Sequence, residues 1–372
     1  MKATSVFAPA ACAMVIGLSG LCGSAVKAAG SLDTGLDLAL APSGSSAASE
    51  VWTLLTGPDG SMQGVLTYAL TYEMQSGKMV YTGHSLDLYA RDGSFVRTVS
   101  TDSSNGYPSF VAASGNVVNG NDYSGIDVYV GHSDRTGDSI DRVVGGLGTS
   151  TGADEKVMTM KGNWAMSFAP DGSAYAMYND GANKIARVNL QAGTAQTVVA
   201  TGGYSGGFDL APNGDLYFST YWMDATRPDE VLRLTAGQLA GALPLDLSAA
   251  QVVAQLPAGM GGGPVAVDKA GDVVFAMNDM TTYSSGLLAC IYAGKDYTGL
   301  PTGYDVLAAG NTWLWQVDTA GDVSQSGSAG LDGAAFVSGD GTPISYVPEP
   351  ASVLLLAGLG LAGVLRRRRR RR

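Results

Sequence analysis

A hairpin-like segment that occurs three times constrains the fold of this chain more than any other feature. Each copy has an apolar, alternating stretch, a turn with glycine and a second apolar stretch; the copies are residues 166–175, 208–217 and 265–274. Their turn glycines, Gly172, Gly214 and Gly271, are 42 and 57 residues apart. Glycine supplies the positive φ that tight turns need, and period-two alternation is typical of half-buried strands. The pattern predicts antiparallel hairpins repeated along the chain.

More strand-like segments surround these hairpins. They are residues 86–90, 95–99, 184–188, 197–200, 230–234 and 251–256. Four short strands in each unit of about 40 to 57 residues are typical of a propeller blade. We therefore predict an all-β domain over residues 29–346, a β-propeller of six or seven four-stranded blades. A β-sandwich is the rival fold, but it does not explain a hairpin that recurs at this spacing.

A second repeat contains both histidines of the chain. Residues 80–85 (VYTGHS) return as 128–133 (VYVGHS), 48 positions later. We interpret His84 and His132 as equivalent positions of adjacent blades. Repetition alone then explains them, and a structural role is favoured over a catalytic pair. The sequence offers no catalytic residue that we would name.

The charge distribution limits the partners of the predicted domain. Residues 31–345 hold 13 Lys and Arg against 32 Asp and Glu, a formal charge of about −19. Such a surface repels phosphate backbones, which argues against nucleic-acid binding. Cations remain compatible with it, and Ca²⁺ is the one candidate cofactor, because carboxylates and carbonyls are its ligands. Asp134, Asp138 and Asp141 form the densest acidic loop and are the candidates for that site.

Two Asn-Asp pairs follow predicted strands of different repeats. They are Asn179 with Asp180, and Asn278 with Asp279. If the repeats superpose, both pairs lie at one rim of the propeller, and they are our candidate ligand rim. Aromatic side chains at Tyr221 and Trp222, and at Trp313 and Trp315, could stack on sugars, although packing between blades is the favoured explanation.

Cysteine usage excludes a disulfide framework. Cys12 and Cys22 fall in an N-terminal export signal, so only Cys290 stays in the predicted domain, inside an apolar strand-like run. A buried, inert thiol is expected there. We expect ring closure by strands instead, with residues 36–40 and 51–55 pairing with 333–337 and 344–346.

The N-terminus has the three parts of a secretory signal. Lys2 precedes an apolar stretch, which small residues follow up to Ala28. We predict a signal peptide over residues 1–28, with cleavage after Ala28 and export by the Sec machinery.

The C-terminus combines a short motif, an apolar segment and a basic tail. Val347, Pro348, Glu349 and Pro350 begin the motif of residues 347–352, and the apolar segment of residues 351–365 follows. As a helix this segment would be about 22 Å long, short for a bilayer. The basic tail nevertheless favours a membrane span, because seven adjacent cations fit a cytoplasmic stop-transfer flank. Its residues are Arg366, Arg367, Arg368, Arg369, Arg370, Arg371 and Arg372. We predict a transmembrane helix over residues 351–365.

This ending resembles the PEP-CTERM sorting domain of Gram-negative bacteria, over residues 347–372. The resemblance implies that an exosortase, a membrane-embedded cysteine protease, recognises and processes the protein. The precursor would be anchored in the inner membrane, and the product would reach the cell surface or the extracellular matrix. The two prolines agree with this role, because they prevent helix and strand pairing and so present an extended peptide to an enzyme.

The Ala-Pro-Asp-Gly turn at 169–172 and the Ala-Pro-Asn-Gly turn at 211–214 resemble those of gluconolactonase-like and NHL-type propellers. In the gluconolactonase-like enzymes Glu, Asn and Asp hold a divalent metal in the central channel. Here none of Glu50, Glu73, Glu155 and Glu230 begins a strand in the required pattern. Our leading hypothesis is therefore a non-enzymatic propeller that binds polysaccharide or surface proteins, or acts structurally, in exopolysaccharide or biofilm. A secreted, metal-dependent, lactonase-like hydrolase is the alternative.

Overall fold

The structure is a computed structural model, and it describes the greater part of the predicted domain. The described residues are 49–56, 62–75, 78–90, 95–102, 107–115, 122–133, 138–148, 154–222, 228–267, 271–280, 286–298, 303–310, 316–317, 322–324 and 329–330. Most of the described residues lie in β-strands. The single α-helix among them is α1 (Ala236–Leu239), and the 3₁₀ turns are η1 (Gly146–Gly148) and η2 (Leu247–Ala249).

The strands form separate antiparallel sheets in chain order. The first holds β1 (Ser49–Thr56), β2 (Met62–Gln75), β3 (Lys78–Ala90) and β4 (Phe95–Asp102). The second holds β5 (Tyr107–Ser114), β6 (Asp127–Ser133), β7 (Ser139–Val143) and β8 (Asp154–Thr159). The third holds β9 (Asn163–Phe168), β10 (Ala174–Asn179), β11 (Asn183–Asn189) and β12 (Thr194–Ala200).

The later sheets repeat this meander. The fourth holds β13 (Tyr204–Leu210), β14 (Leu216–Tyr221), β15 (Glu230–Leu234) and β16 (Gln251–Gln255). The fifth holds β17 (Met260–Val267), β18 (Val273–Asp279), β19 (Gly286–Ile291) and β20 (Asp305–Gly310). A sheet of three short strands comes last, with β21 (Gln316–Val317), β22 (Asp322–Ser324) and β23 (Ala329–Gly330).

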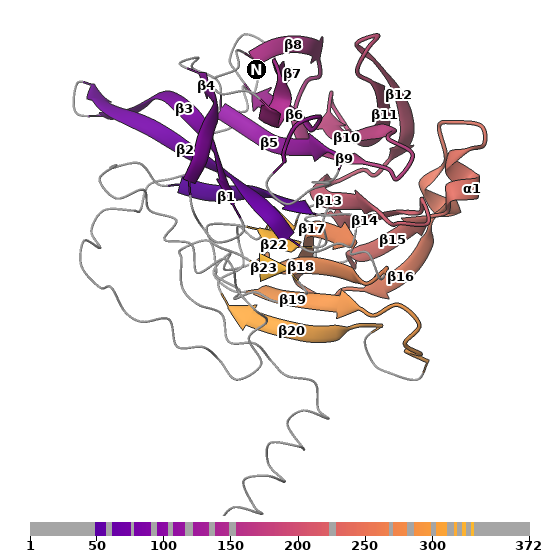
Figure 1. Cartoon of the computed structure of the whole chain (residues 1–372). Helices are drawn as coiled ribbons and strands as arrows, with labels where there is room; N and C mark the ends of the chain where they lie inside the picture. Colours follow the sequence, from indigo (N-terminus) through magenta and orange to yellow (C-terminus); the bar gives the residue numbers. More distant parts are fainter. Residues whose placement is uncertain are drawn as a thin grey trace, which may run out of the picture.

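The sheets are arranged as in a β-propeller. The first strand of each four-stranded sheet contacts the first strand of the next, from β1 through β5, β9 and β13 to β17. β17 then contacts β21, and β22 contacts β1. Figure 1 shows these first strands around the middle of the molecule and β8, β12, β16 and β20 at its periphery. We call the first strands the inner strands.

Each pair of successive four-stranded sheets encloses its own hydrophobic cluster. Alternation along β10 shows how, because Ala174 and Ala176 pack toward the second sheet while Tyr175 and Met177 pack toward the fourth. Side chains of a strand point alternately to its two faces, so one strand supplies two interfaces. The period-two pattern in the sequence therefore encodes the stacking of sheets as well as the strands.

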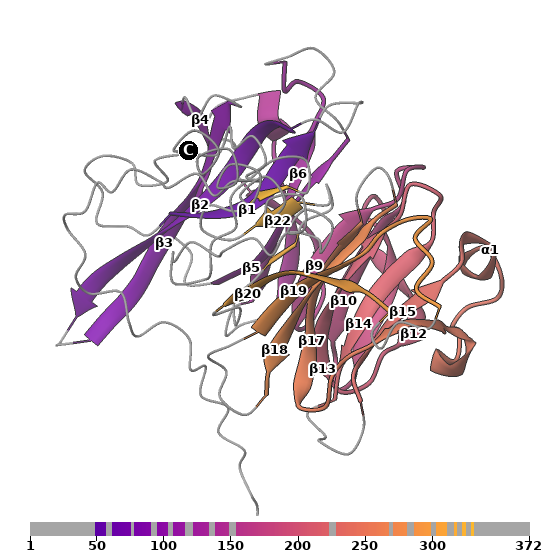
Figure 2. The same cartoon turned by 90° about the horizontal axis from the view of Figure 1, so that it is seen from below.

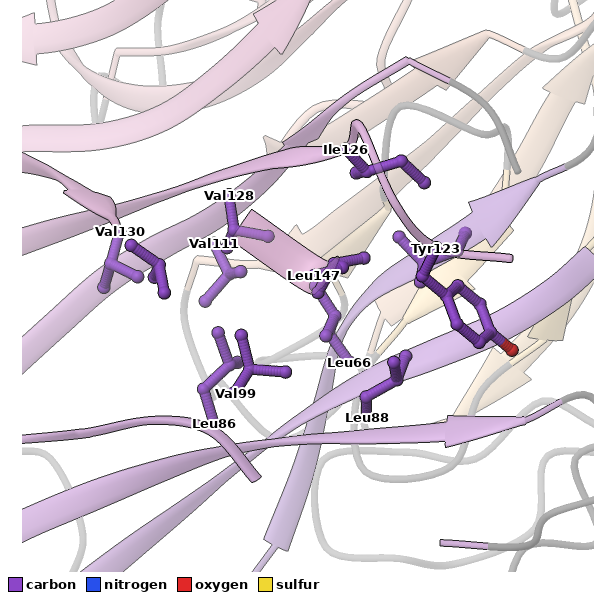
Figure 3. Packing of buried hydrophobic residues seen from close by; sticks show 12 residues of the cluster. Leu66, Leu86, Leu88, Val99, Val111, Tyr123, Ile126, Val128, Val130 and Leu147 are labelled. Atoms are coloured by element: carbon purple, nitrogen blue, oxygen red, sulfur yellow. The ribbon is translucent and has the colours of Figure 1, made fainter. Parts of the chain in front are cut away.

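The cluster between the first two sheets shows this packing at close range. Leu66, Leu86 and Leu88 of the first sheet face Val128 and Val130 of the second (Figure 3), and each is at most 1 % exposed. Figure 2 shows the ends of β2 and β3 projecting away from the rest of their sheet. The hydrophobic contacts thus concentrate where sheets face each other.

The repeated hairpins are confirmed. Gly172 and Gly214 lie in the turns that join β9 to β10 and β13 to β14, and Gly271 lies two residues before the start of β18. All three have positive φ, at +83°, +83° and +89°. Cys290 is fully buried in β19, as predicted.

Two predictions need correction. Five sheets of four strands lie in the described part of the chain, where we expected six or seven. The described residues after Gly310 form strands of two or three residues. His84 and His132 are not equivalent either: the first lies in the third strand of its sheet, the second in the second strand of the next. The two nearly identical segments thus occupy different strand positions.

The predicted closing strands remain untested. Residues 51–55 lie in β1, which pairs with β2. Residues 36–40, 333–337 and 344–346 lie outside the described residues.

Candidate functional site

Both Asn-Asp pairs of the candidate rim lie at the same face of the sheets. β10 ends at Asn179 beside the start of β9, and Tyr178 pairs with Asn163. β18 ends at Asp279 beside the start of β17, and Asp279 pairs with Met260. Because neighbouring strands are antiparallel, second strands end where inner strands begin. We call this the strand-start face.

Asn179 and Asp180 are engaged in the turn between β10 and β11. The Asn179 side chain accepts a hydrogen bond from the Gly181 N–H (2.9 Å) and donates one to Asn183 Oδ1 (2.8 Å). Asp180 accepts from Lys184 Nζ at 2.7 and 2.9 Å. The hydrogen bond from Lys184 lowers the pKa of Asp180. Asn residues commonly close turns in this way, so these contacts stabilise the turn, and the role of the pair in ligand binding stays a prediction.

The second pair, Asn278 and Asp279, is placed by the backbone pairing of β18 with its neighbouring strands. Asn278 pairs with Gly261 on one side and with Gly286 on the other, while its side chain lies outside the described part. Asp279 is partly buried. The structure thus places both pairs at equivalent strand ends of the third and fifth sheets.

The acidic loop is split between described and undescribed residues. Asp134 lies outside the described residues. Asp138 accepts a hydrogen bond from the backbone N–H of Gly162 and so joins the second sheet to the start of β9. Within the ranges that the structure describes, no group of three or more His, Cys, Asp or Glu side chains has the arrangement of a metal site. The Ca²⁺ hypothesis stays a prediction.

Asp141 belongs to a buried polar cluster between the first two sheets. His132 is 4 % exposed, and its Nε2 lies 3.8 Å from Asp141 Oδ2 and 3.8 Å from Asp154 Oδ2. Ser100 of β4 donates to Asp154 Oδ1 at 2.7 Å. His132 therefore sits in a blade interface.

Asn163 joins the second and third sheets at the strand-start face. It is 1 % exposed, and its amide donates to the carbonyls of His132 (3.3 Å), Ser139 (3.2 Å) and Met160 (2.8 Å). Its Oδ1 accepts from the Ser109 hydroxyl. Nothing in the sequence singles out Asn163, since Ser109, His132 and Ser139 lie 54, 31 and 24 residues away in the chain.

A carboxylate with a similar bridging role lies at the other end of the inner strands. Asp209 of β13 is 1 % exposed; its Oδ1 accepts from Ser167 Oγ of β9 (2.6 Å), and its Oδ2 from the Val267 N–H of β17 (2.8 Å). One side chain thus links three consecutive sheets. Burying a carboxylate is costly unless hydrogen bonds such as these satisfy its oxygens.

The predicted aromatic pair lies on glycine-rich backbone. A Cβ atom at Gly202 would come within 2.5 Å of the Trp222 ring, and one at Gly261 would overlap the Tyr221 ring. Both rings are partly buried at the end of β14. Glycine is thus required here for the rings to lie against the neighbouring strands. Trp313 and Trp315 lie outside the described residues.

The terminal signals lie outside the described residues. They are the signal peptide with Ala28, the motif residues Val347 to Pro350, the apolar segment and the arginine tail. Among the residues whose placement is described, no helix is long and apolar enough to cross a membrane.

A comparison with protein families identifies the C-terminal end. Residues 347–371 match the family described as the PEP-CTERM protein-sorting motif. The chain thus carries this motif, which implies an exported protein of a Gram-negative bacterium that an exosortase processes, anchored in the membrane before it reaches the surface. No curated protein matches the chain.

Some solved structures resemble the chain at low similarity. TolB from Acinetobacter baumannii has 14% identity and a TM-score of 0.47, with 80% of this chain and 62% of that chain covered. The aldose sugar dehydrogenase from Streptomyces coelicolor has 15% identity and a TM-score of 0.45, covering 73% and 86%. A gluconolactonase from Xanthomonas campestris has 15% identity and a TM-score of 0.36, covering 60% and 72%. Similarity at this level carries no information about activity.

Proposed function

We propose that this chain is an exosortase-processed surface or matrix protein whose propeller has a non-enzymatic binding or structural role in exopolysaccharide or biofilm. The sorting motif at residues 347–371 is the observation that carries the proposal. A protein delivered to the surface by this route meets the polysaccharide and proteins of the matrix. The proposal assigns the propeller to that setting.

The use of polar side chains supports a scaffold role. Asn163 and Asp209, both 1 % exposed, join successive sheets through hydrogen bonds. Asp180 of the candidate rim is paired with Lys184. Fully satisfied buried networks make a fold rigid, and rigidity lowers the entropy lost on binding. These groups therefore stabilise the surface that the propeller would present.

The test uses the full-length chain in a Gram-negative host that contains an exosortase. A Glu349→Ala variant and an exosortase deletion should both retain the protein at the inner membrane. Each should also reduce the exopolysaccharide that the cells retain. The matched control is Glu155→Ala, since Glu155 is exposed and belongs to the propeller. Normal surface delivery without the exosortase would contradict the proposal.

An activity assay addresses the hydrolase alternative. The exported protein is incubated with sugar lactones and added Ca²⁺ or Mn²⁺, and hydrolysis is followed by pH-stat titration. We expect no turnover above background. Metal-dependent turnover that disappears in Asp180→Ala or Asp279→Ala would replace the non-enzymatic role with a lactonase-like one.

A further inference from the structure

Trp164 differs from the other exposed apolar side chains in its place in the fold. Among the described residues, the large hydrophobic side chains that are exposed are Phe95, Val144, Trp164, Val252 and Val306. Phe95, Val252 and Val306 lie in the fourth strands of their sheets, and Val144 follows β7. Trp164 is 46 % exposed, yet it lies in the inner strand β9. An indole at this position is exposed near the centre of the propeller, whereas the others are peripheral.

A β-bulge explains why the ring is exposed. Ala165 pairs with Met177 and Asn163 pairs with Tyr178, so the register shifts at Trp164. Bulges re-aim side chains and are frequent beside functional sites. The side chain is therefore displaced from the alternation that buries Met166 between the second and third sheets.

The neighbouring residue holds this bulge in place. Asn163 makes the hydrogen bonds to His132, Ser139, Met160 and Ser109 described above. Gly131 leaves the room for it, because a Cβ there would collide with Asn163 Oδ1 and with the Phe110 ring. The backbone that carries Trp164 is thus fixed to the second sheet. An aromatic side chain on a rigid backbone binds a ligand with little loss of entropy.

We propose that Trp164 stacks on a pyranose ring of a neutral or amino-bearing polysaccharide. This inference rests on the proposed function and names the ligand class for the strand-start face. The C–H bonds on the face of a pyranose carry partial positive charge, which suits the negative face of an indole. Uronate-rich chains are disfavoured, because residues 31–345 carry 32 acidic against 13 basic side chains.

The test measures glycan binding by the full exported chain. Isothermal titration is performed with a glucosamine oligosaccharide, a neutral glucose oligosaccharide and an oligogalacturonate. We expect binding of at least one of the first two, and at least a tenfold loss of affinity in Trp164→Ala. Trp164→Phe should keep part of the affinity. Phe95→Ala is the matched control, since it also removes an exposed ring but from an outer strand.

Circular dichroism and the thermal midpoint establish that each variant is folded. If Trp164→Ala does not fold, glycan protection of tryptophan fluorescence against acrylamide is compared between wild type and Trp164→Phe. Protection that disappears in Trp164→Phe supports the inference. Preferential binding of the oligogalacturonate, equal losses in Phe95→Ala, or no glycan binding at all would overturn it. None of these results alters the outcome of the exosortase experiment, so the two proposals fail separately.

Discussion

The turns that join the first two strands of the third and fourth sheets share one backbone conformation. Ala169 N–H donates to the Ser173 carbonyl and Ala211 N–H to the Asp215 carbonyl, both at 2.8 Å. The glycine N–H of each turn donates to the alanine carbonyl, again at 2.8 Å, and φ is +83° at Gly172 and at Gly214. Sequence and geometry therefore repeat together here.

The residue that ends each turn makes the difference. Ser173 is partly exposed, whereas Asp215 is 4 % exposed and accepts from Arg233 Nε and from the Ala236 N–H, both at 2.8 Å. Ala236 is the first residue of α1, whose N-terminus also has a capping box between Thr235 and Gln238. The turn backbone is thus the same in both sheets, whereas the buried Asp215 carboxylate adds hydrogen bonds that connect the fourth sheet to α1. Repeated backbone does not imply repeated contacts.

The largest effect is expected from Asp215→Ala. The change leaves Arg233 without its carboxylate and the start of α1 without an acceptor, which should lower the free energy of unfolding by about 2–3 kcal/mol. Urea denaturation followed by circular dichroism measures it. Ser173→Ala at the equivalent position should stay within about 0.5 kcal/mol of wild type. Equal losses in the two variants would show that Asp215 has no special role.

The repeated turns belong to the features that could be predicted from the sequence. Gly172 and Gly214 could be placed because a tight turn demands a local backbone conformation that few residues adopt. The segment 230–234 was predicted as a strand and is β15. Such features depend on neighbours in the chain. They are sufficient to predict an all-β propeller.

The unpredicted features depend on partners from other sheets. In the sequence, Asp209 and Asn163 look like ordinary turn or strand-end residues. The hydrogen-bond partners of Asp209 are 42 and 58 residues away in the chain, and two partners of Asn163 are 24 and 31 residues away. The bulge at Trp164 also has no local signal. In contrast, the near-identity of residues 80–85 and 128–133 is misleading, because the position of a strand in its sheet is set by pairing with neighbouring strands. Hence the fold was more predictable than the site.

The glycines of the two turns should respond unequally to alanine. Both substitutions impose a positive φ on a residue with a Cβ, which costs about 1 kcal/mol. In addition, a Cβ at Gly214 would lie 3.2 Å from the Ala236 Cβ, while at Gly172 it would meet nothing within 4 Å. We expect Gly214→Ala to lose about 1–2 kcal/mol and Gly172→Ala about 1 kcal/mol. Thermal unfolding of the two variants side by side provides the measurement. A larger loss in Gly172→Ala would contradict the contact with α1.

Exchanging the residue before the glycine probes the same carboxylate. Asn213 donates from Nδ2 to Asp215 Oδ2 at 3.0 Å, whereas the third sheet has Asp171 at this position. Asn213→Asp would replace the donor with a second carboxylate, and we expect a loss of about 1 kcal/mol at neutral pH from the lost hydrogen bond and the repulsion. The loss should shrink when the pH is lowered, because protonation removes the repulsion. Asn213→Ser is the uncharged control, and a loss that does not change with pH would refute the repulsion.

The smallest effect is expected from Asp171→Asn, which gives the turn of the third sheet the residue found in the fourth. The Ser173 N–H donates to Asp171 Oδ1 at 2.9 Å, and this backbone hydrogen bond, with one from the Ser173 hydroxyl, lowers the pKa of Asp171. A lowered pKa in the folded state means that the carboxylate stabilises the fold above its unfolded pKa of about 3.9. This contribution is lost as the pH falls through the lower folded value. Because Asp171 is exposed, we expect this contribution to be only a few tenths of a kcal/mol.

The stability difference between wild type and Asp171→Asn, measured by urea denaturation from about pH 6 to about pH 3, should favour wild type at the upper end and diminish toward the lower end. A difference that grows with acid would mean that the hydrogen bond from Ser173 does not favour the charged form.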